Sequence, residues 1–115
     1  MINRLIEKRQ HPRLKFAYPV SFDIPGAGET NSVLSKDISL GGMGFVHNRF
    51  IPVNTPLKLR INILSRVLNS VGIIRQSVPI AHSDSYYTGV EFKEFNSEDK
   101  QYLNNYIQYI QLRAG

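Results

Sequence analysis

The sequence from Leu57 to Ile63 reads LKLRINI, and this stretch decides the fold class. Aliphatic side chains occupy every second position, and polar side chains lie between them. A period of two is the pattern of a β-strand with one buried face, because successive side chains of a strand point to opposite sides of the sheet. The stretch therefore predicts a strand that covers a hydrophobic core.

Five further segments carry strand signals on either side of this one. In residues 15–24 apolar side chains again alternate, and Pro19 within them favours an edge position or a bulge because proline cannot donate a ladder hydrogen bond. The remaining expected strands are residues 31–38, 43–47, 67–76 and 86–92. Six short strands spaced about ten residues apart are typical of an all-β barrel or sandwich.

The last segment changes to the period of a helix. From Ser97 onward, Leu103, Ile107 and Ile110 fall on one face. Ser97 is the expected N-cap, and the two acidic residues after it suit the positive end of the helix dipole. We expect an amphipathic C-terminal α-helix over residues 97–112 that packs over the barrel, with a docking surface on its tyrosine-rich flank as the alternative.

The composition is that of an ordinary globular protein, with 42% hydrophobic and 20% charged residues among 115. A chain of this length supports one hydrophobic core. The absence of cysteine excludes disulfides, thiolate metal sites and cysteine nucleophiles. The N-terminus lacks the pattern of a secretory signal, and no apolar run approaches the ~18 residues of a membrane span, so we expect a cytoplasmic protein.

The net charge of +5 is unevenly distributed along the chain. Residues 1–15 carry five basic side chains and one acidic side chain, whereas residues 84–99 carry five acidic side chains and one basic side chain. We therefore expect residues 1–14 to form a flexible basic arm ahead of a single domain over residues 15–112. Such an arm favours an anionic partner, for example a nucleotide, a nucleic acid or a lipid headgroup.

A catalytic or metal-binding function has no support in the sequence. His11, His47 and His82 lie in different segments without the spacing of metal ligands. Ser39, His47 and Asp37 form a triad only on paper, because no nucleophile elbow surrounds the serine and strand positions hold these side chains on divergent vectors. We expect no enzymatic activity, no catalytic residue and no metal site.

A pair of arginines stands out in the basic arm. Arg9 and Arg13 are four residues apart, and Pro12 between them opposes a continuous helix. Positions i and i+4 project to one side in a helix and in a strand alike, so both guanidinium groups can face one ligand. The planar fork of arginine pairs with phosphate oxygens or with the O6/N7 edge of guanine.

A second motif, DISLGGMG, covers residues 37–44 and ends an expected strand in a glycine-rich turn. Glycines let a ligand approach the backbone closely and let amide groups point at an anion. Asp37 can accept hydrogen bonds from the N1–H and N2–H₂ groups of a guanine, and Ser39 can donate or accept beside it. The alternative is a β-turn in which both side chains satisfy local backbone donors.

Taken together, Arg-x-x-x-Arg followed by Asp-x-Ser-x-x-Gly resembles the PilZ family of bacterial cyclic di-GMP receptors. Residues 89–92, Gly-Val-Glu-Phe, are similar to the family's pattern in its last strand, so the resemblance runs from about Glu7 to Ile110. It implies a mainly β fold, a six-stranded antiparallel β-barrel of the split-barrel type with a C-terminal helix. It also implies a ligand at the outer surface, between the arm and the glycine turn.

The resemblance implies eight ligand-binding residues. The arginine pair contacts phosphates and guanine edges, and the second motif surrounds a guanine. Arg75 stands near the place where related domains stack an aromatic side chain on a base, and it is alternatively a solvent-facing strand residue. Lys8 precedes the arginine pair at a position that influences whether one ligand or two bind, so the stoichiometry stays open. The full set is Lys8, Arg9, Arg13, Asp37, Ser39, Gly41, Gly42 and Arg75.

We expect a stand-alone receptor, without a cofactor, that binds cyclic di-GMP, orders its N-terminal arm and relays the signal to a separate protein partner. Motility, biofilm formation and adhesion are processes that the family resemblance allows. One alternative is a small barrel that binds single-stranded nucleic acid through its arm. That alternative leaves Asp37 unexplained because a carboxylate opposes a phosphate backbone, so we expect no DNA binding. Another alternative is a PilZ scaffold that binds no ligand.

Overall fold

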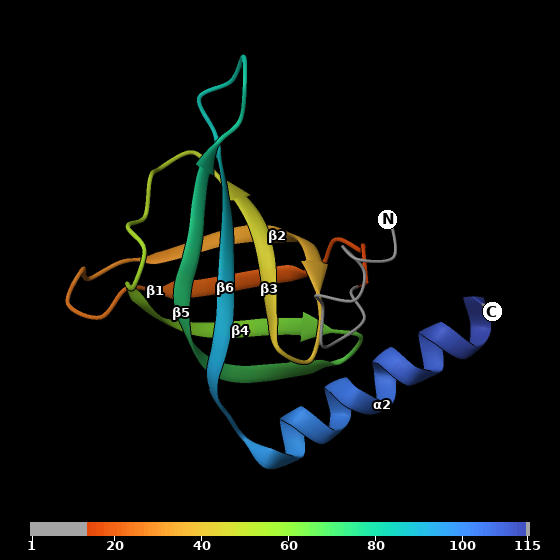
Figure 1. Ribbon diagram of the computed structural model, residues 1–115. Helices are drawn as coiled ribbons and strands as arrows, with labels where there is room; N and C mark the ends of the chain where they lie inside the picture. Colours follow the sequence, from red (N-terminus) through yellow and green to blue (C-terminus); the bar gives the residue numbers. More distant parts are fainter. Residues whose placement is uncertain (1–13, 115) are drawn as a thin grey trace.

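The computed structural model describes residues 14–114, which form a closed antiparallel barrel followed by one helix (Figure 1). Around the barrel the strands follow the order β1-β2-β3-β6-β5-β4, and pairing of β1 with β4 closes the ring. The expected six-stranded barrel with a C-terminal helix is therefore confirmed. The elements are β1 (Pro19–Asp23), β2 (Thr30–Ile38), β3 (Gly42–His47), β4 (Pro56–Ile63), β5 (Arg66–Pro79), β6 (Tyr86–Phe95) and α2 (Ser97–Ala114).

The barrel interior is built from the period-two pattern of its strands. In β4 the four aliphatic side chains are at most 1% exposed, whereas Lys58 and Arg60 between them point outward. Phe22 of β1 and Phe45 of β3 stack across the interior with ring centroids 5.1 Å apart. On the outside of the closing seam, the Arg60 guanidinium donates to both carboxylate oxygens of Asp23 at 3.0 and 3.2 Å. Apolar burial inside and an ion pair outside thus hold β1 against β4.

The first strand begins later than the alternation predicts. Residues 15–18 precede the strand, and Pro19 is its first residue, paired with Leu34 of β2. The expected edge position or bulge at Pro19 is wrong, because a closed barrel has no edge and a proline at the first position of a strand needs no ladder donor. Backbone and side-chain bonds combine here: Ser35 N–H donates to the carbonyl of Tyr18, Tyr18 N–H donates to Ser35 Oγ, and Ser35 Oγ donates to the carbonyl of Phe16, all at 2.9 Å.

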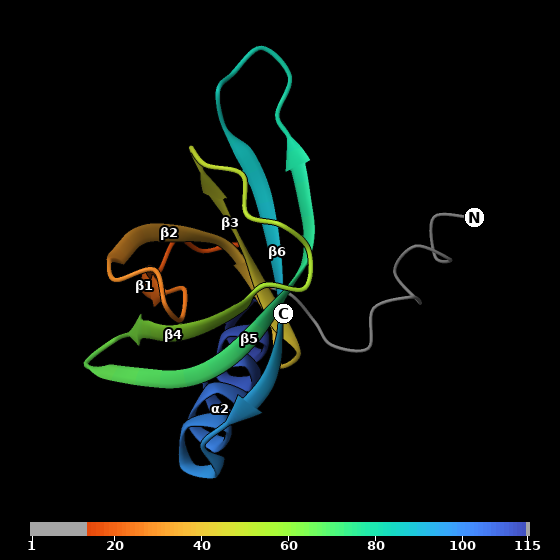
Figure 2. The same cartoon turned by 90° about the vertical axis from the view of Figure 1, so that its left-hand side faces the viewer.

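Two strands extend well beyond their expected ends. β5 runs from Arg66 to Pro79 and β6 from Tyr86 to Phe95. Their hairpin projects from one end of the barrel, and α2 lies at the opposite end in both views (Figures 1 and 2). Strand bulges between Val71 and Gly72 and between Ile74 and Gln76 let these long strands follow the curvature of the barrel.

The helix is capped one residue earlier than expected. Asn96 Oδ1 accepts hydrogen bonds from the backbone N–H groups of Glu98 and Asp99 at 2.8 and 3.2 Å, so Asn96 is the N-cap and the assignment to Ser97 is wrong. β6 stays paired with β5 as far as Phe95, which leaves Asn96 as the first residue free of the ladder. Leu103 and Ile107 are buried against the barrel.

Polar contacts also tie α2 to the barrel. The Tyr18 hydroxyl donates to the Tyr106 hydroxyl at 2.9 Å, and burial together with this bond raises the pKa of the Tyr18 phenol. Asp99 Oδ1 accepts from the Arg66 guanidinium at 3.0 and 3.2 Å, and its Oδ2 accepts from the backbone N–H of Asn69 at 3.0 Å. The Asp99 side chain is 9% exposed, so this carboxylate is the buried polar link between α2 and β5.

Removing that link is expected to loosen the helix from the barrel. Asp99→Ala deletes the acceptor of a buried backbone N–H and the partner of Arg66, and we expect the free energy of unfolding to fall by about 2 kcal/mol in urea denaturation. Glu98→Ala is the matched control, because Glu98 shares the first helical turn and its dipole but is exposed. Equal losses in the two variants would show that the Asp99 contacts contribute nothing beyond the dipole.

Candidate ligand-binding site

The glycine-rich turn connects β2 to β3 through a short loop that Ser39 holds together. The backbone N–H of Ser39 donates to the carbonyl of Gly42 at 2.8 Å, and the Ser39 hydroxyl donates to the same carbonyl at 3.3 Å. The backbone N–H of Gly41 in turn donates to Ser39 Oγ at 3.2 Å. Ser39 is 3% exposed and therefore fixes the loop geometry, as the β-turn alternative anticipates.

The glycines of this turn let β3 approach β6 very closely. A Cβ at Gly42 would lie 2.1 Å from the carbonyl oxygen of Val90, a contact that only a shift of the backbone would relieve. The carbonyl of Gly41 accepts from the backbone N–H of Phe92 at 2.9 Å, which continues the ladder past the end of β3. Strand packing thus requires glycine at position 42.

Leu14 connects the N-terminal segment to the same place. Its N–H donates to the carbonyl of Ile38 at 2.8 Å, and its carbonyl accepts from the N–H of Ile38 at 2.9 Å. The Leu14 side chain is buried in the core. Because Ile38 lies between Asp37 and Ser39, the bridge holds Leu14 beside the second motif.

Three expected site residues, Lys8, Arg9 and Arg13, lie outside the described residues. Arg13 is covalently joined to Leu14, so its Cα is about 3.8 Å from that of Leu14. The bridge holds Leu14, the first described residue, against Ile38.

Asp37 lies at one side of a surface formed by Gly44 and Gly89, which we call the glycine floor. It pairs with Gly44 of β3, and Gly44 pairs with Gly89 of β6, so three strands contribute one row. Their chain neighbours Met43, Phe45, Thr88 and Val90 point into the barrel, which places the row on the outer face. Gly44 and Gly89 have no side chains, and the Tyr87 phenol from β6 covers the backbone at Gly44.

Tyr87 contributes to this floor, and the sequence did not point to it. Its hydroxyl donates to Asp37 Oδ2 at 2.8 Å, which requires the side chain to reach from β6 across β3. A Cβ at Gly44 would lie 1.9 Å from the Tyr87 hydroxyl oxygen, so only glycine at that position lets the phenol pass. The signal for this contact is the register that places Gly44 opposite both Asp37 and Gly89, which periodicity does not reveal.

Arg75 lies on the same outer face but on β5, at the bulge between Ile74 and Gln76. Around the barrel β5 is the third strand from β2, which corresponds to a separation of about 14 Å. Arg75 Nε donates to Glu91 Oε1 at 2.7 Å, and its Nη1 donates to Asn54 Oδ1 at 3.1 Å. The hydrogen bond from Arg75, with the nearby charge of Lys93, lowers the pKa of the Glu91 carboxyl. Arg75 is exposed, and the structure pairs it with an acidic neighbour rather than with the glycine turn.

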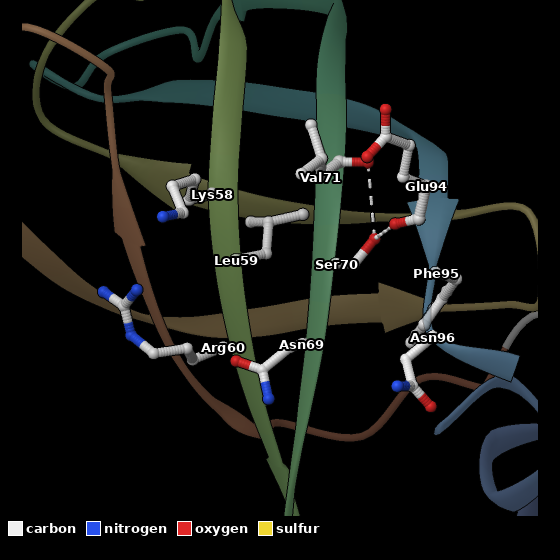
Figure 3. Close-up of a pocket in the computed structure, with 9 residues that line it drawn as sticks. All are labelled: Lys58, Leu59, Arg60, Asn69, Ser70, Val71, Glu94, Phe95 and Asn96. Atoms are coloured by element: carbon white, nitrogen blue, oxygen red, sulfur yellow. Dashed lines mark hydrogen bonds between the residues drawn. The ribbon is translucent and has the colours of Figure 1, made fainter. Parts of the chain in front are cut away.

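A surface cavity of about 390 Å³ lies elsewhere, over β4, β5 and the end of β6 (Figure 3). Its basic side chains are Lys58 and Arg60, and the Arg60 guanidinium is already bound by Asp23. Ser70 Oγ donates to the backbone carbonyl of Glu94 at 2.8 Å. None of the five expected ligand-binding residues within the described part of the chain lines this cavity, so it is separate from the glycine turn.

Within residues 14–114, no three histidine or carboxylate side chains come together in a way that would hold a metal ion. In the same part of the chain, no helix combines the length and the apolar character that crossing a membrane requires. The polar groups that do converge are those of the turn and the glycine floor. They are suited to hydrogen bonding and to contact with a planar group.

Comparison with known families identifies this arrangement, since the sequence model of the PilZ domain matches residues 7–109. The chain belongs to the PilZ domain family. The match includes the arginine pair, the turn and Gly89, so the resemblance drawn from these motifs is confirmed. PilZ domains bind cyclic di-GMP as a ligand. No curated protein sequence matches this chain.

Solved PilZ structures share the fold at low sequence identity. The Bacillus subtilis inhibitor of motility MotI/DgrA has a TM-score of 0.81 at 23% identity, over 91% of this chain and 52% of its own. The K. pneumonia MrkH–c-di-GMP complex has a TM-score of 0.75 at 20% identity, over 92% and 53%. The c-di-GMP complex of the PilZ domain of YcgR from Escherichia coli has a TM-score of 0.69 at 15% identity, over 93% and 94%. The chain thus spans about half the length of MotI and MrkH and nearly the whole isolated PilZ domain of YcgR.

Proposed function

We propose that this PilZ domain is a receptor that binds cyclic di-GMP on the outer face of the barrel, between the arginine pair and the β2–β3 turn. The observation that carries the proposal is the Leu14–Ile38 bridge, which joins the Arg-x-x-x-Arg segment to the middle of Asp37-Ile38-Ser39. Structures of two similar proteins, MrkH and YcgR, contain this ligand, which supports the same chemistry here.

Each group at the site suits one part of the ligand. The guanidinium groups of Arg9 and Arg13 pair with phosphate oxygens and with the O6/N7 edge of guanine, and Lys8 adds positive charge. The Asp37 carboxylate accepts from the N1–H and N2–H₂ donors of a guanine, which lies against the turn held by Ser39. Arg75 stacks on a second base once it leaves Glu91, because a guanidinium plane can stack where related domains use an aromatic ring.

The charges at this surface argue for a guanine dinucleotide over a single-stranded nucleic acid. Asp37 lies opposite Gly44 and Glu91 lies opposite Gly42, so acidic residues flank β3 on both sides. A continuous phosphate backbone would be repelled by these carboxylates, whereas a guanine edge offers Asp37 two donors. A short cyclic ligand can direct its phosphates to the arginines and its base to Asp37.

Titration calorimetry with cyclic di-GMP at near-physiological salt tests the assignment. We expect saturable binding, and we expect Arg13→Ala to weaken it by at least about tenfold because a charge-assisted hydrogen bond is lost. Lys15→Ala is the matched control, since Lys15 is exposed, carries the same charge and lies on the other side of Leu14. Its affinity should stay within a factor of about two, in keeping with the small effect of an exposed charge.

Parallel titrations with GTP and a short single-stranded oligonucleotide separate the alternatives. Binding of the oligonucleotide but not of cyclic di-GMP, with steep salt dependence, would replace the proposal by a nucleic-acid barrel. Absence of binding by all three ligands would leave a scaffold. Equal losses in the arginine and lysine variants would show that charge alone, and not the Arg13 position, determines affinity.

We propose further that bound ligand holds residues 1–13 against the barrel and thereby changes a surface offered to a separate protein partner. Leu14 is the fixed point from which this segment departs, so contacts made by Arg9 and Arg13 would position the whole arm. Regulation of motility or biofilm formation in the cytoplasm fits such a relay, and the similarity to an inhibitor of motility supports the first of these.

Limited trypsin digestion tests the relay. Cleavage after Arg4, Lys8 and Arg9 should slow several-fold when cyclic di-GMP is bound, because a held segment is a poorer protease substrate. The Arg13→Ala variant at the same ligand concentration should show no protection. Saturable binding of the ligand without any change in cleavage would contradict the relay while leaving the receptor function intact.

A further inference from the structure

We propose that Tyr87 is a positioning residue for guanine recognition. This role rests on the proposed function of the Asp37 site. Its hydroxyl holds the Asp37 carboxylate in the orientation that receives the two donors of a guanine edge. The bond that carries this inference is the one from Tyr87 Oη to Asp37 Oδ2 at 2.8 Å.

The strands around this bond are shaped to allow it. Tyr87 belongs to β6 and Asp37 to β2, so the side chain spans the intervening strand β3. It passes over Gly44, where a Cβ would lie 1.9 Å from the hydroxyl oxygen and 2.4 Å from Cζ of the ring. A Cβ at Gly89 would lie 3.8 Å from Cε2 of the ring, in ordinary contact. Gly44 is thus the position that makes room for the phenol.

A fixed carboxylate matters for this ligand because its contacts are directional. The terminal torsion of an aspartate is broad, so an unsupported carboxylate samples many orientations. A guanine presents N1–H and N2–H₂ side by side, and two well-aligned hydrogen bonds need the carboxylate plane to face that edge. A carboxylate has about four acceptor positions, and the hydrogen bond from Tyr87 occupies one of them.

Ligands that differ in their hydrogen-bond donors distinguish a positioning role of Tyr87 from a purely structural one. If the hydroxyl only braces the barrel, its loss affects every ligand equally. If it orients Asp37, its loss affects most the ligand that uses two donors at once. The inosine analogue of the dinucleotide keeps N1–H but lacks the N2 amino group, so it needs the orientation less.

The test compares Tyr87→Phe with Tyr86→Phe, the matched loss of a hydroxyl from the adjacent residue, which packs against Phe50. Calorimetry or competition measures both cyclic di-GMP and cyclic di-inosine monophosphate on each variant. Tyr87→Phe should weaken cyclic di-GMP about tenfold and the inosine ligand clearly less, because a bond to a charged acceptor is lost. Gly44→Ala, which displaces the phenol, should reproduce this loss of preference, and Tyr86→Phe should change neither affinity.

Each other outcome overturns the inference. If Tyr87→Phe binds cyclic di-GMP as tightly as the unaltered protein, the hydroxyl does not contribute to binding. If it binds more tightly, the hydroxyl competes with the base for Asp37. Equal losses for both ligands would assign Tyr87 a structural role. Failure of the unaltered protein to bind either dinucleotide would instead reject the proposed function, so the two failures are distinguishable.

Discussion

Two backbone hydrogen bonds between Leu14 and Ile38 determine how the rest of the site is arranged. They fix the start of the described chain against the end of β2, at the residue that separates Asp37 from Ser39. The buried Leu14 side chain anchors this contact in the core. Arg13 directly precedes Leu14 in the chain, so the proposed arginine pair adjoins in sequence the residue that is held beside Asp37 and Ser39.

Contacts within the folded chain require glycine at two positions on the outer face of the barrel. Gly42 has no side chain because β6 lies too close, and Gly44 has none because the Tyr87 phenol crosses it. Both requirements arise within the folded chain, and the phenol that covers Gly44 bonds to Asp37. Ser39 likewise holds the loop by local hydrogen bonds. In this barrel, the residues that stabilise the turn belong to the motif that we propose surrounds a guanine.

The strand pattern was predictable because burial inside a barrel imposes a period of two, as in β4. The boundaries of the elements were less predictable. β1 begins only at Pro19, and just before it Tyr18 N–H donates to the side chain of Ser35. The helix cap lies at Asn96 because β6 stays paired through Phe95. These shifts depend on partners distant in the sequence.

The binding motifs were visible in the sequence because their residue types match guanine and phosphate chemistry at short spacing. Tyr87 was not visible, since its contact with Asp37 depends on the registers of β2 with β3 and of β3 with β6. The pairing of Arg75 with Glu91 was hidden for the same reason, because the two residues meet only across the β5–β6 pair at a bulge.

Nuclear magnetic resonance of the ¹⁵N-labelled protein during titration with cyclic di-GMP tests the central claim most directly. The account predicts that the largest amide shift changes fall on residues 37–44 and 87–91, with smaller changes on the outer face of β4. Changes concentrated at the cavity beside Lys58 and Asn69, with residues 37–44 unaffected, would contradict it.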